Sequence, residues 1–469
     1  MIKSKRLTRL APGLLIAMSA CAAPAGAPRD VVSVDAPLVA LTHVRVIDGT
    51  GAPGRSDQTI VIRGGLIADL GDARSVPLPP EARVIDLSGR TVLPGFVMLH
   101  EHFFYTPDGN GYTTHLVSFP RLYLAGGATT VRTGGGFGLR AERKLQQAIE
   151  QGVLPGPAID LTSPYIDRSL LPAFFGSGAE RGQRLAAKYA DQGATSFKTY
   201  EHLTRAELAG VIEEAHRRGL KVTGHLCAVT FTEAAELGID NLEHGLWVAT
   251  DFVADKQPDT CPPADRAWGA MLSASPASVD RLIRTLVGRG VAVTSTLPVF
   301  ETFLPGREPA PQEALALMAP KARDRYLQKR AELAAQPHPG WARLLRKEME
   351  FEVAFVRAGG LLVAGSDPTG HGGVVAGFSN QRAIELLVEA GFSPADAIRI
   401  ATLNGARFLR REAEIGTVAR GKHADLVVVR GDPEDRISAI EQVETVFKDG
   451  VGYDSRKLKD SVQGLVGLR

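Results

Sequence analysis

The sequence predicts an α/β protein with a parallel (β/α)8 barrel, a TIM barrel, and a small β-sandwich domain formed by both chain ends. Between residues 93 and 406, short β-branched apolar runs alternate with helical patterns, which favours a parallel barrel. The flanking segments 38–92 and 407–460 contain short alternating runs broken by Gly and Asp, typical of strands joined by tight turns. The length of 469 residues exceeds one usual domain. An open doubly wound sheet is the alternative architecture.

The predicted barrel strands are short, and several carry a His, Lys or Asp at or near their end. They cover residues 93–100, 128–133, 157–163, 195–200, 221–226, 240–245, 291–297 and 361–367. Apolar residues at helical spacing predict helices at 205–219, 276–289, 313–335 and 340–358. The stretch from about 298 to 340 is too long for a simple connection, so we expect a lid or helical insertion there.

The N-terminus has the features of an export signal. Residues 1–21 contain basic residues, then an apolar run and Cys21, and small residues follow. Residues 18–21 resemble a bacterial lipobox, with Met18 in place of the preferred Leu. We therefore expect an exported, periplasmic protein, anchored to the membrane by a lipid on Cys21, with a linker at 22–37. Cleavage at a nearby A-x-A site, giving a soluble periplasmic protein, is the alternative.

Composition excludes some partners. The chain is 44% hydrophobic and 23% charged, as soluble globular proteins are. Its 54 basic and 52 acidic residues nearly cancel, and no long basic block follows the N-terminus. We therefore expect neither a nucleic acid nor an anionic membrane surface as a partner. A homo-oligomer remains open.

Four of the 11 histidines lie at the ends of predicted strands: His100, His102, His225 and His244. Asp367 ends the eighth predicted strand in the same way. The carboxyl ends of all strands of a (β/α)8 barrel meet at one mouth, so these five side chains should converge. His100 and His102 are two residues apart, on one face of a strand, where two imidazoles can chelate a cation. Together these residues predict a metal site.

Lys198 ends the fourth predicted strand and is the unusual member of the set. An ammonium group among metal cations would be repelled, and burial lowers the pKa of a lysine. A neutral lysine amine, however, reacts with carbon dioxide to give a carbamate, an anionic ligand with two oxygens that suits two metals. The alternative is a lysine paired with a nearby carboxylate.

The motifs LPGFVMLHEH, SFKTY, VTGHL, NLEHG and AGSDP, in this order, resemble the amidohydrolase superfamily, and more narrowly its imidazolonepropionase-related and prolidase-like branch. The resemblance covers residues 38 to 455. It implies two divalent metal ions, with zinc expected and Mn, Co or Fe also fitting the ligands. By this resemblance, one ion is bound by His100, His102 and Asp367, the more exposed ion by His225 and His244, and carboxylated Lys198 bridges both.

Two positions depart from the pattern of many relatives. Met98 stands where many have Asp, and Arg132-Thr133 stands where many have an Arg-Asp pair. Neither departure removes a metal ligand. Both indicate a separate subfamily, so a relative's substrate cannot be transferred to this chain.

The ligand set predicts an exported binuclear hydrolase of C–N bonds in an amide, dipeptide or cyclic amide. A hydroxide bridging the metals would attack the carbonyl, with Asp367 as general acid and base. Glu243 is a candidate acceptor for a ligand histidine. Tyr200 could donate to the substrate carbonyl, and Arg132 and His371 could hold a substrate carboxylate. For these last three residues, ordinary polarity at the barrel rim is the alternative.

Two other functions compete with this prediction. One is a mononuclear deaminase or imidazolonepropionase-type hydrolase, but such relatives lack the bridging lysine, so Lys198 argues against it. The other is a non-catalytic binding protein on the same fold. Such proteins typically lose metal ligands, whereas all six are present here, which favours the enzyme.

Besides Cys21, the chain contains Cys227 and Cys261. Export would place both in an oxidising compartment, where disulfides persist. We therefore expect a Cys227–Cys261 disulfide that holds the loop after the sixth predicted strand over the metals. Two free thiols are the alternative.

Overall fold

The computed structural model describes residues 30–169 and 178–468. The expected signal peptide at 1–21, with Cys21, and the first half of the linker at 22–37 lie outside the described residues. The predicted linker is shorter than expected. Residues Val32–Val34 form strand β1, which pairs with strand β19 (Val451–Asp454). The β domain therefore begins before residue 38.

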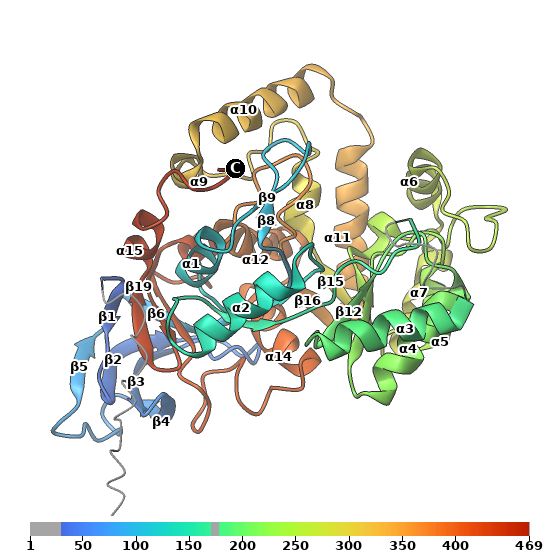
Figure 1. Ribbon diagram of the computed structural model, residues 1–469. Coiled ribbons are helices and arrows are strands. Elements are labelled where there is room, and N and C mark those ends of the chain that lie inside the picture. The colour runs from blue at the N-terminus through green and yellow to red at the C-terminus, as the bar shows by residue number, and fades with distance from the viewer. Residues whose placement is uncertain (1–29, 170–177, 469) are drawn as a thin grey trace, which may run out of the picture.

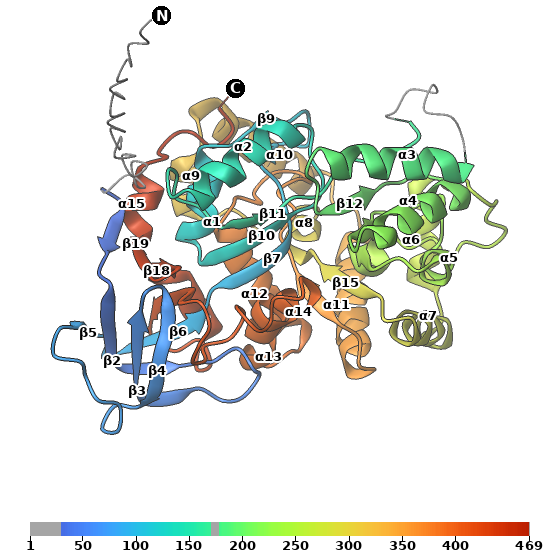
Figure 2. The same cartoon turned by 60° about the horizontal axis from the view of Figure 1, so that its bottom comes forward.

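Parallel strands form the centre of the larger domain, and each predicted run contains one of them. Three strands form a parallel sheet, in the order β11-β10-β7: β7 (Phe96–Glu101), β10 (Ala128–Thr133) and β11 (Ala158–Asp160) (Figure 2). Five more form a second parallel sheet, in sequence order: β12 (Ser196–Thr199), β13 (Lys221–Gly224), β14 (Asn241–Glu243), β15 (Ala292–Ser295) and β16 (Leu362–Ala364). The predicted α/β class with parallel strands is confirmed.

The two parallel sheets contact each other at both ends. Beyond β11, Thr162 and Ile166 form isolated parallel bridges with Ser196 and Thr199 of β12. At the other end, the carbonyl of His100 in β7 accepts hydrogen bonds from backbone N–H groups just after β16, at 3.2 and 3.0 Å. Residues far apart in the sequence are thereby brought to one edge.

Helices surround these sheets, and several begin at residues suited to helix N-termini. Thr204 and Thr230 each form a capping box with the Glu three residues later, and Ser275 caps a helix whose first residue is Pro276. The helices of this domain are α1 (Ser118–Ala125), α2 (Leu139–Glu150), α3 (Gly178–Asp191), α4 (Arg205–Arg217), α5 (Phe231–Leu237), α6 (Ala264–Ser273), α7 (Pro276–Gly288), α8 (Leu297–Glu301), α9 (Gln312–Leu317), α10 (Pro320–Ala335), α11 (Trp341–Arg357), α12 (Phe378–Ala390), α13 (Pro394–Arg399) and α14 (Gly405–Phe408). A further helix, α15 (Ser455–Asp460), follows β19.

The expected insertion at 298–340 is helical. It contains α8, α9 and α10, and the last two lie at the top of Figure 1. The single helix predicted at 313–335 is interrupted between α9 and α10. Pro320 begins α10, and a proline disfavours helical geometry in the residue before it.

The β domain combines strands from both chain ends, as predicted. Figure 1 shows the blue and red strands together at one side of the molecule. They are β1, β2 (Leu38–Val46), β3 (Arg55–Arg63), β4 (Leu66–Asp72), β5 (Arg83–Asp86), β6 (Arg90–Pro94), β17 (Leu426–Arg430), β18 (Val443–Lys448) and β19. N-terminal β6 pairs antiparallel with C-terminal β17, which joins the two ends.

These strands form one continuous nine-stranded sheet, where the sequence predicted a sandwich. The order is β1-β19-β18-β17-β6-β2-β3-β4, with β5 paired to β2. The continuity comes from β2, whose first half pairs with β5 and whose last residues pair with β6. Between them the register shifts near His43, whose φ is 55°. Alternate apolar residues of β2, β3 and β17 still face one shared core.

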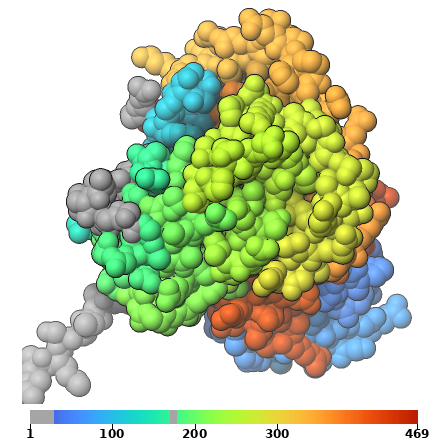
Figure 3. Space-filling view, turned by 90° about the vertical axis from the view of Figure 1, so that its right-hand side faces the viewer, coloured from blue at the N-terminus to red at the C-terminus, as the bar shows by residue number. Residues whose placement is uncertain are grey.

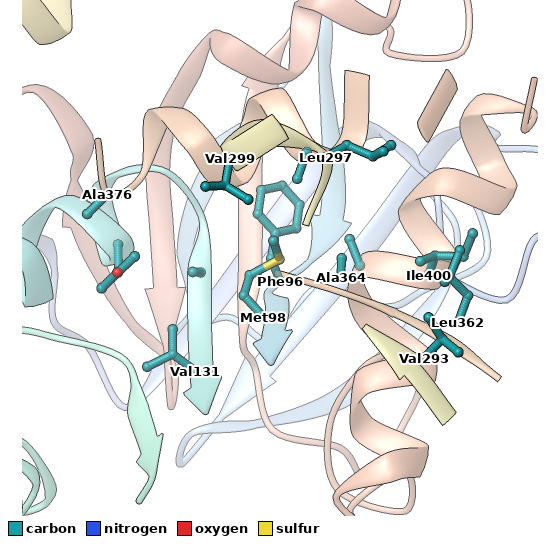
Figure 4. Packing of buried hydrophobic residues seen from close by; sticks show 14 of the residues in the cluster. Phe96, Met98, Val131, Val293, Leu297, Val299, Leu362, Ala364, Ala376 and Ile400 are labelled. Atoms are coloured by element: carbon teal, nitrogen blue, oxygen red, sulfur yellow. The ribbon is translucent and has the colours of Figure 1, made fainter. Parts of the chain in front are cut away.

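The core of the larger domain lies around the parallel strands. Phe96, Met98, Val131, Val293 and Leu362 are all buried in it (Figure 4). Met98, which departs from the relatives' Asp, therefore occupies an apolar site, where a charged side chain would be costly. Within the described ranges, no helix is both long and apolar enough to cross a bilayer.

Candidate metal centre

Six predicted ligands lie at the carboxyl ends of five parallel strands. His100 is in β7 and His102 just beyond it, Lys198 is in β12, His225 follows β13, His244 follows β14, and Asp367 follows β16. Three of them form a compact buried cluster, His100, His102 and Asp367, whose ligand atoms all lie within 4.8 Å of one another. Asp367 Oδ1 is 3.3 Å from His102 Nε2 and 3.8 Å from His100 Nε2.

Hydrogen bonds orient the histidines for metal binding. His100 Nδ1 donates to Glu243 Oε2 at 2.8 Å, and His102 Nδ1 donates to the Gly135 carbonyl at 2.9 Å. With Nδ1 protonated, the Nε2 lone pair of each ring is free toward Asp367. Burial, and after it the positive charge of Lys198, lowers the pKa of His100 to about 4. This imidazole is therefore neutral at neutral pH.

His244 and His225 extend the cluster. The His244 ring centroid lies 4.6 Å from that of His100 and 4.6 Å from that of His225. His244 Nδ1 is 2.7 Å from Thr296 Oγ1, which leaves its Nε2 as the available nitrogen. His225 Nε2 lies 3.4 Å from Glu201 Oε1. The sequence did not indicate Thr296 or Glu201, because neither belongs to a recognisable spacing.

Lys198 is fully buried beside this cluster. Its Nζ has no hydrogen-bond partner, and Glu243 Oε1, 3.9 Å away, is beyond hydrogen-bond reach. Burial is the main cause that lowers the pKa of Lys198 to about 8, against the opposing effect of Glu243 and Asp367. An unsatisfied buried amine with a lowered pKa fits a lysine that becomes carboxylated and binds metal, and fits a simple ion pair less well.

Glu243 connects the ligands to the interior. It accepts from His100 Nδ1, from Arg132 Nη2 at 2.8 Å and from the Thr223 hydroxyl. Burial alone would raise its pKa, but Lys198, His100 and Arg132 hold that pKa well below its ordinary value. The predicted role of Glu243 as an acceptor for a ligand histidine is confirmed, although its partner is His100 and not the adjacent His244.

The prediction that Arg132 holds a substrate carboxylate is wrong, because its side chain is buried. It is 1% exposed, and its guanidinium donates to the Leu99 carbonyl, Asn241 Oδ1 and Glu243 Oε1, each at 2.8 Å. These bonds hold it behind the ligands, so it is not available for a substrate carboxylate. Its strand-end position suggested a place at the mouth, but the side chain points into the interior toward buried acceptors.

The neighbours of Asp367 keep its carboxyl group ionised. Burial opposes ionisation, but His100 and a hydrogen bond with His102 hold its pKa well below the ordinary value. Asp367 and His244 adopt φ of 53° and 69°, in the left-handed region. Such a backbone costs energy in non-glycine residues and is found at functional sites. These sharp turns direct both side chains toward the cluster.

Two glycines leave space for the His100 side chain where the backbone passes close to it. A Cβ on Gly134 would lie 2.5 Å from His100 Cδ2, and one on Gly365 would lie 2.5 Å from His100 Cβ. Glu101, between the two ligand histidines, accepts from the Ser366 backbone at 3.0 Å and from Asn380 Nδ2 at 2.8 Å. These contacts tie β7 to the segment after β16. The sequence did not indicate this role of Glu101, because its side chain points to the face of the strand opposite to that of the two histidines.

Tyr200 and His371 lie near the cluster. The Tyr200 ring centroid is 4.8 Å from that of His225 and 4.9 Å from that of Tyr165, so Tyr200 flanks the more exposed part of the site. The ring of His371 packs at 4.6 Å from Phe303, and burial lowers its pKa to about 4. A neutral His371 brings no positive charge for a carboxylate.

A cavity of about 420 Å³ opens beside the ligands, and its wall includes His225, His244 and Asp367. Cys227 and Cys261 line it too and form a disulfide, with Cα atoms 4.9 Å apart. The predicted disulfide is confirmed, and it holds the segment before α6 against the residues that follow β13.

Sequence comparison finds a matching family model and curated relatives. The sequence model described as "Amidohydrolase family" matches residues 91–452. An imidazolonepropionase of Nocardia farcinica (strain IFM 10152) is 30% identical over 177 residues, which cover 35% of this chain and 40% of that protein. A dihydroorotase of Anaeromyxobacter dehalogenans (strain 2CP-C) is 40% identical over 87 residues, 19% of each chain. This chain thus spans less than half the length of these curated relatives.

Solved structures share the fold over nearly the whole chain. A Xaa-Pro dipeptidase with bound methionine superposes with a TM-score of 0.65 at 22% identity, covering 89% of this chain and 100% of that one. A bottromycin amidohydrolase superposes with a TM-score of 0.68 at 21% identity, covering 91% of this chain and 89% of that one. At this identity the likeness concerns the fold alone.

Proposed function

The chain belongs to the amidohydrolase family, and from that membership and the ligand cluster we propose that it is a binuclear metal-dependent hydrolase of C–N bonds in small amides or peptides. The observation that carries the proposal is the buried Lys198 amine, which has no hydrogen-bond partner and lies beside four histidines and Asp367. A mononuclear site would leave this amine without a role.

The donors fit two divalent cations, and imidazole with carboxylate oxygen suits zinc. His100, His102 and Asp367 would hold one ion, and His225 and His244 the other. Lys198, as its carbamate, would supply an oxygen to each. Bound divalent ions lower the pKa of water and polarise a carbonyl oxygen.

The chain's own residues move the proton. Asp367, held ionised by His100 and His102, can accept the proton of the attacking water and deliver it to the leaving nitrogen. Glu243 fixes His100 through Nδ1, and Arg132 fixes Glu243. Tyr200, whose ring packs beside His225, would donate to the substrate carbonyl. Preorganised groups of this kind lower the barrier because they need no rearrangement during reaction.

We further propose that the two parallel sheets close into one (β/α)8 barrel. The bridges from Thr162 and Ile166 to β12, and the bonds from the segment after β16 to His100 of β7, support closure at both seams. The position of the ligands at the carboxyl strand ends is where such barrels carry active sites.

We also propose that the protein is exported to the periplasm and anchored through Cys21. The Cys227–Cys261 disulfide supports this, because disulfides persist in oxidising compartments.

The function is tested with a panel of dipeptides, N-acyl amino acids and simple amides, with lactones and phosphotriesters as controls. We expect amide hydrolysis that stops when a chelator removes the metals and returns when they are restored. Asp367→Asn should lower kcat by roughly 10²–10⁴-fold. A fully metallated wild type that cleaves lactones or phosphotriesters but no amide would overturn the C–N assignment.

A further inference from the structure

Aromatic side chains form much of the wall of the cavity beside the metal ligands. Trp247, Trp268, Phe300 and Phe303 line it. They come from three separate segments: Trp247 from the 3-10 helix Gly245–Val248, Trp268 from α6, and Phe300 and Phe303 from α8 and the residues just after it. No feature of the ligand motifs requires this wall.

The wall is rigid. The Trp247 ring stacks on Phe300 with centroids 4.1 Å apart and an interplanar angle of 11°. On its other side, Trp341 of α11 lies at 5.8 Å and 14°. The backbone N–H of Trp247 also donates to buried Glu348 at 2.8 Å. Trp247, Trp268 and Trp341 are the chain's only tryptophans, so its whole tryptophan content lies in or behind this wall.

The remaining wall is closed by a covalent link. The Cys227–Cys261 disulfide lines the cavity together with Pro262 and Ala264. It fixes the segment between β14 and α6 to the residues that follow β13. Segments α3 to α7, coloured green and yellow, cover the middle of the face seen in Figure 3, with orange segments above them and red and blue segments below. The cavity therefore has a preformed shape.

The charges that line the cavity disfavour an anion. Among the described residues of its wall, the ionisable groups are Glu201 and the metal ligands His225, His244 and Asp367, with no Lys or Arg. Arg132 is occupied behind the ligands, and burial lowers the pKa of nearby His371 to about 4. A carboxylate placed against the tryptophans would find no lysine or arginine among the described residues of the wall and would face Glu201.

We propose that this cavity binds an uncharged aromatic group of the substrate, so that the preferred substrates are amides carrying such a group beside the scissile bond. The substrate class rests on the proposed function, whereas binding of the group does not require hydrolysis. A cavity of roughly 150 Å³ accommodates a benzene ring, so about 420 Å³ holds a ring together with the atoms that link it to the carbonyl. Burying a ring here should favour an aromatic amide over its methyl analogue by about ten- to hundredfold in kcat/KM.

Binding is tested on the metal-loaded protein with three ketones, which resemble amides at the carbonyl but cannot be hydrolysed. The probes are 4-phenylbutan-2-one, butan-2-one and 4-(3-oxobutyl)benzoate, the first probe with a carboxylate on its ring. Because all tryptophans lie at the cavity, their fluorescence reports its occupancy. We expect 4-phenylbutan-2-one to bind at least tenfold more tightly than either other probe. Equal affinity for all three, or preference for the benzoate, would overturn the proposal.

Ala267→Phe fills the cavity from α6, and Ser273→Phe adds the same side chain at an exposed position of that helix. We expect only Ala267→Phe to weaken 4-phenylbutan-2-one at least tenfold, with metal content and unfolding midpoint equal in both variants. Unchanged affinity in a folded Ala267→Phe protein would overturn the proposal. The three-ketone comparison decides if that variant does not fold. Selective ketone binding without hydrolysis of any amide would refute the proposed function and leave the cavity's preference standing.

Discussion

Arg132→Met removes a buried cation from behind the metal ligands, and its cost follows from the contacts of the guanidinium. The Leu99 carbonyl loses its bond from Arg132 Nε, and Glu243 keeps His100 and Thr223 as donors but loses its closest cation. Breaking a buried ion pair by removing one partner costs about 3–5 kcal/mol. We expect a loss of that size in the free energy of unfolding.

The same substitution should weaken metal binding. Glu243 orients His100, and removing a partner of that kind typically lowers metal affinity by roughly 10–100-fold. The measurements are equilibrium unfolding in urea and metal affinity by competition with a chelator. Both are made on wild type and variant under the same conditions.

Arg181→Met is the matched control. Arg181 and Glu207 form another buried ion pair, at 2.8 Å, which joins α3 to α4. Neither residue of this pair is a predicted metal ligand. This variant should lose stability of the same order, about 3–5 kcal/mol, while its metal affinity stays that of the wild type. The reasoning is refuted if Arg132→Met loses less than about 1 kcal/mol, or if both variants bind metal equally well.

Three further predictions concern other parts of the molecule. Removing the Cys227–Cys261 link, which joins residues 34 apart, should cost about 4 kcal/mol; a double Cys→Ala variant as stable as the oxidised wild type would contradict this. Burial raises the pKa of Glu352 to about 8, and its Oε2 has no hydrogen-bond partner. Because the folded-state pKa lies above the unfolded value, Glu352 lowers stability progressively as pH rises from the ordinary carboxyl range toward 8. Glu352→Gln should therefore stabilise the protein at pH 8 and flatten that dependence, and identical pH–stability curves would exclude it. Finally, Cys21→Ala should release the protein from the membrane fraction with activity intact, and unchanged partitioning would rule out the lipid anchor.

The strands and the ligand cluster could be predicted from the sequence because their signals are local and repeated. Several of the short apolar runs carry a His, Lys or Asp at or near their end, and parallel strands bring such ends to one edge. His100, His102 and Asp367 meet for that reason, although Asp367 is more than 260 residues from His100 in the chain. The disulfide was predictable because, after Cys21, Cys227 had only one available partner.

Side-chain direction was harder to predict. Arg132 ends a strand, but its side chain turns inward, because buried acceptors on β7 and β14 outcompete solvent at the mouth. Glu243 was expected to bond to a ligand histidine, but its partner could not be predicted. Its bond to His100 joins two strands and depends on distances that the sequence does not contain. The helix break before Pro320 was not predicted, because apolar residues at helical spacing on both sides of this proline suggested one continuous helix.

The aromatic wall had no signal in the sequence. Trp247, Trp268, Phe300 and Trp341 lie in different segments, with no spacing that connects them, and single aromatic residues usually belong to a core. The course of β2 was equally hidden, since its pairing passes from β5 to β6 and its register against β3 shifts near His43. Both features arise from contacts between distant segments.

The central claim, that Lys198 bridges two metals, is tested most directly by counting the metals. Wild type and Lys198→Ala are loaded with zinc with and without bicarbonate, and bound metal per chain is measured after removal of the excess. We expect two ions per chain in wild type loaded with bicarbonate and at most one in Lys198→Ala, with partial recovery of the variant by acetate or propionate in the vacated space. A Lys198→Ala protein that keeps two ions per chain and normal turnover would contradict the bridging role.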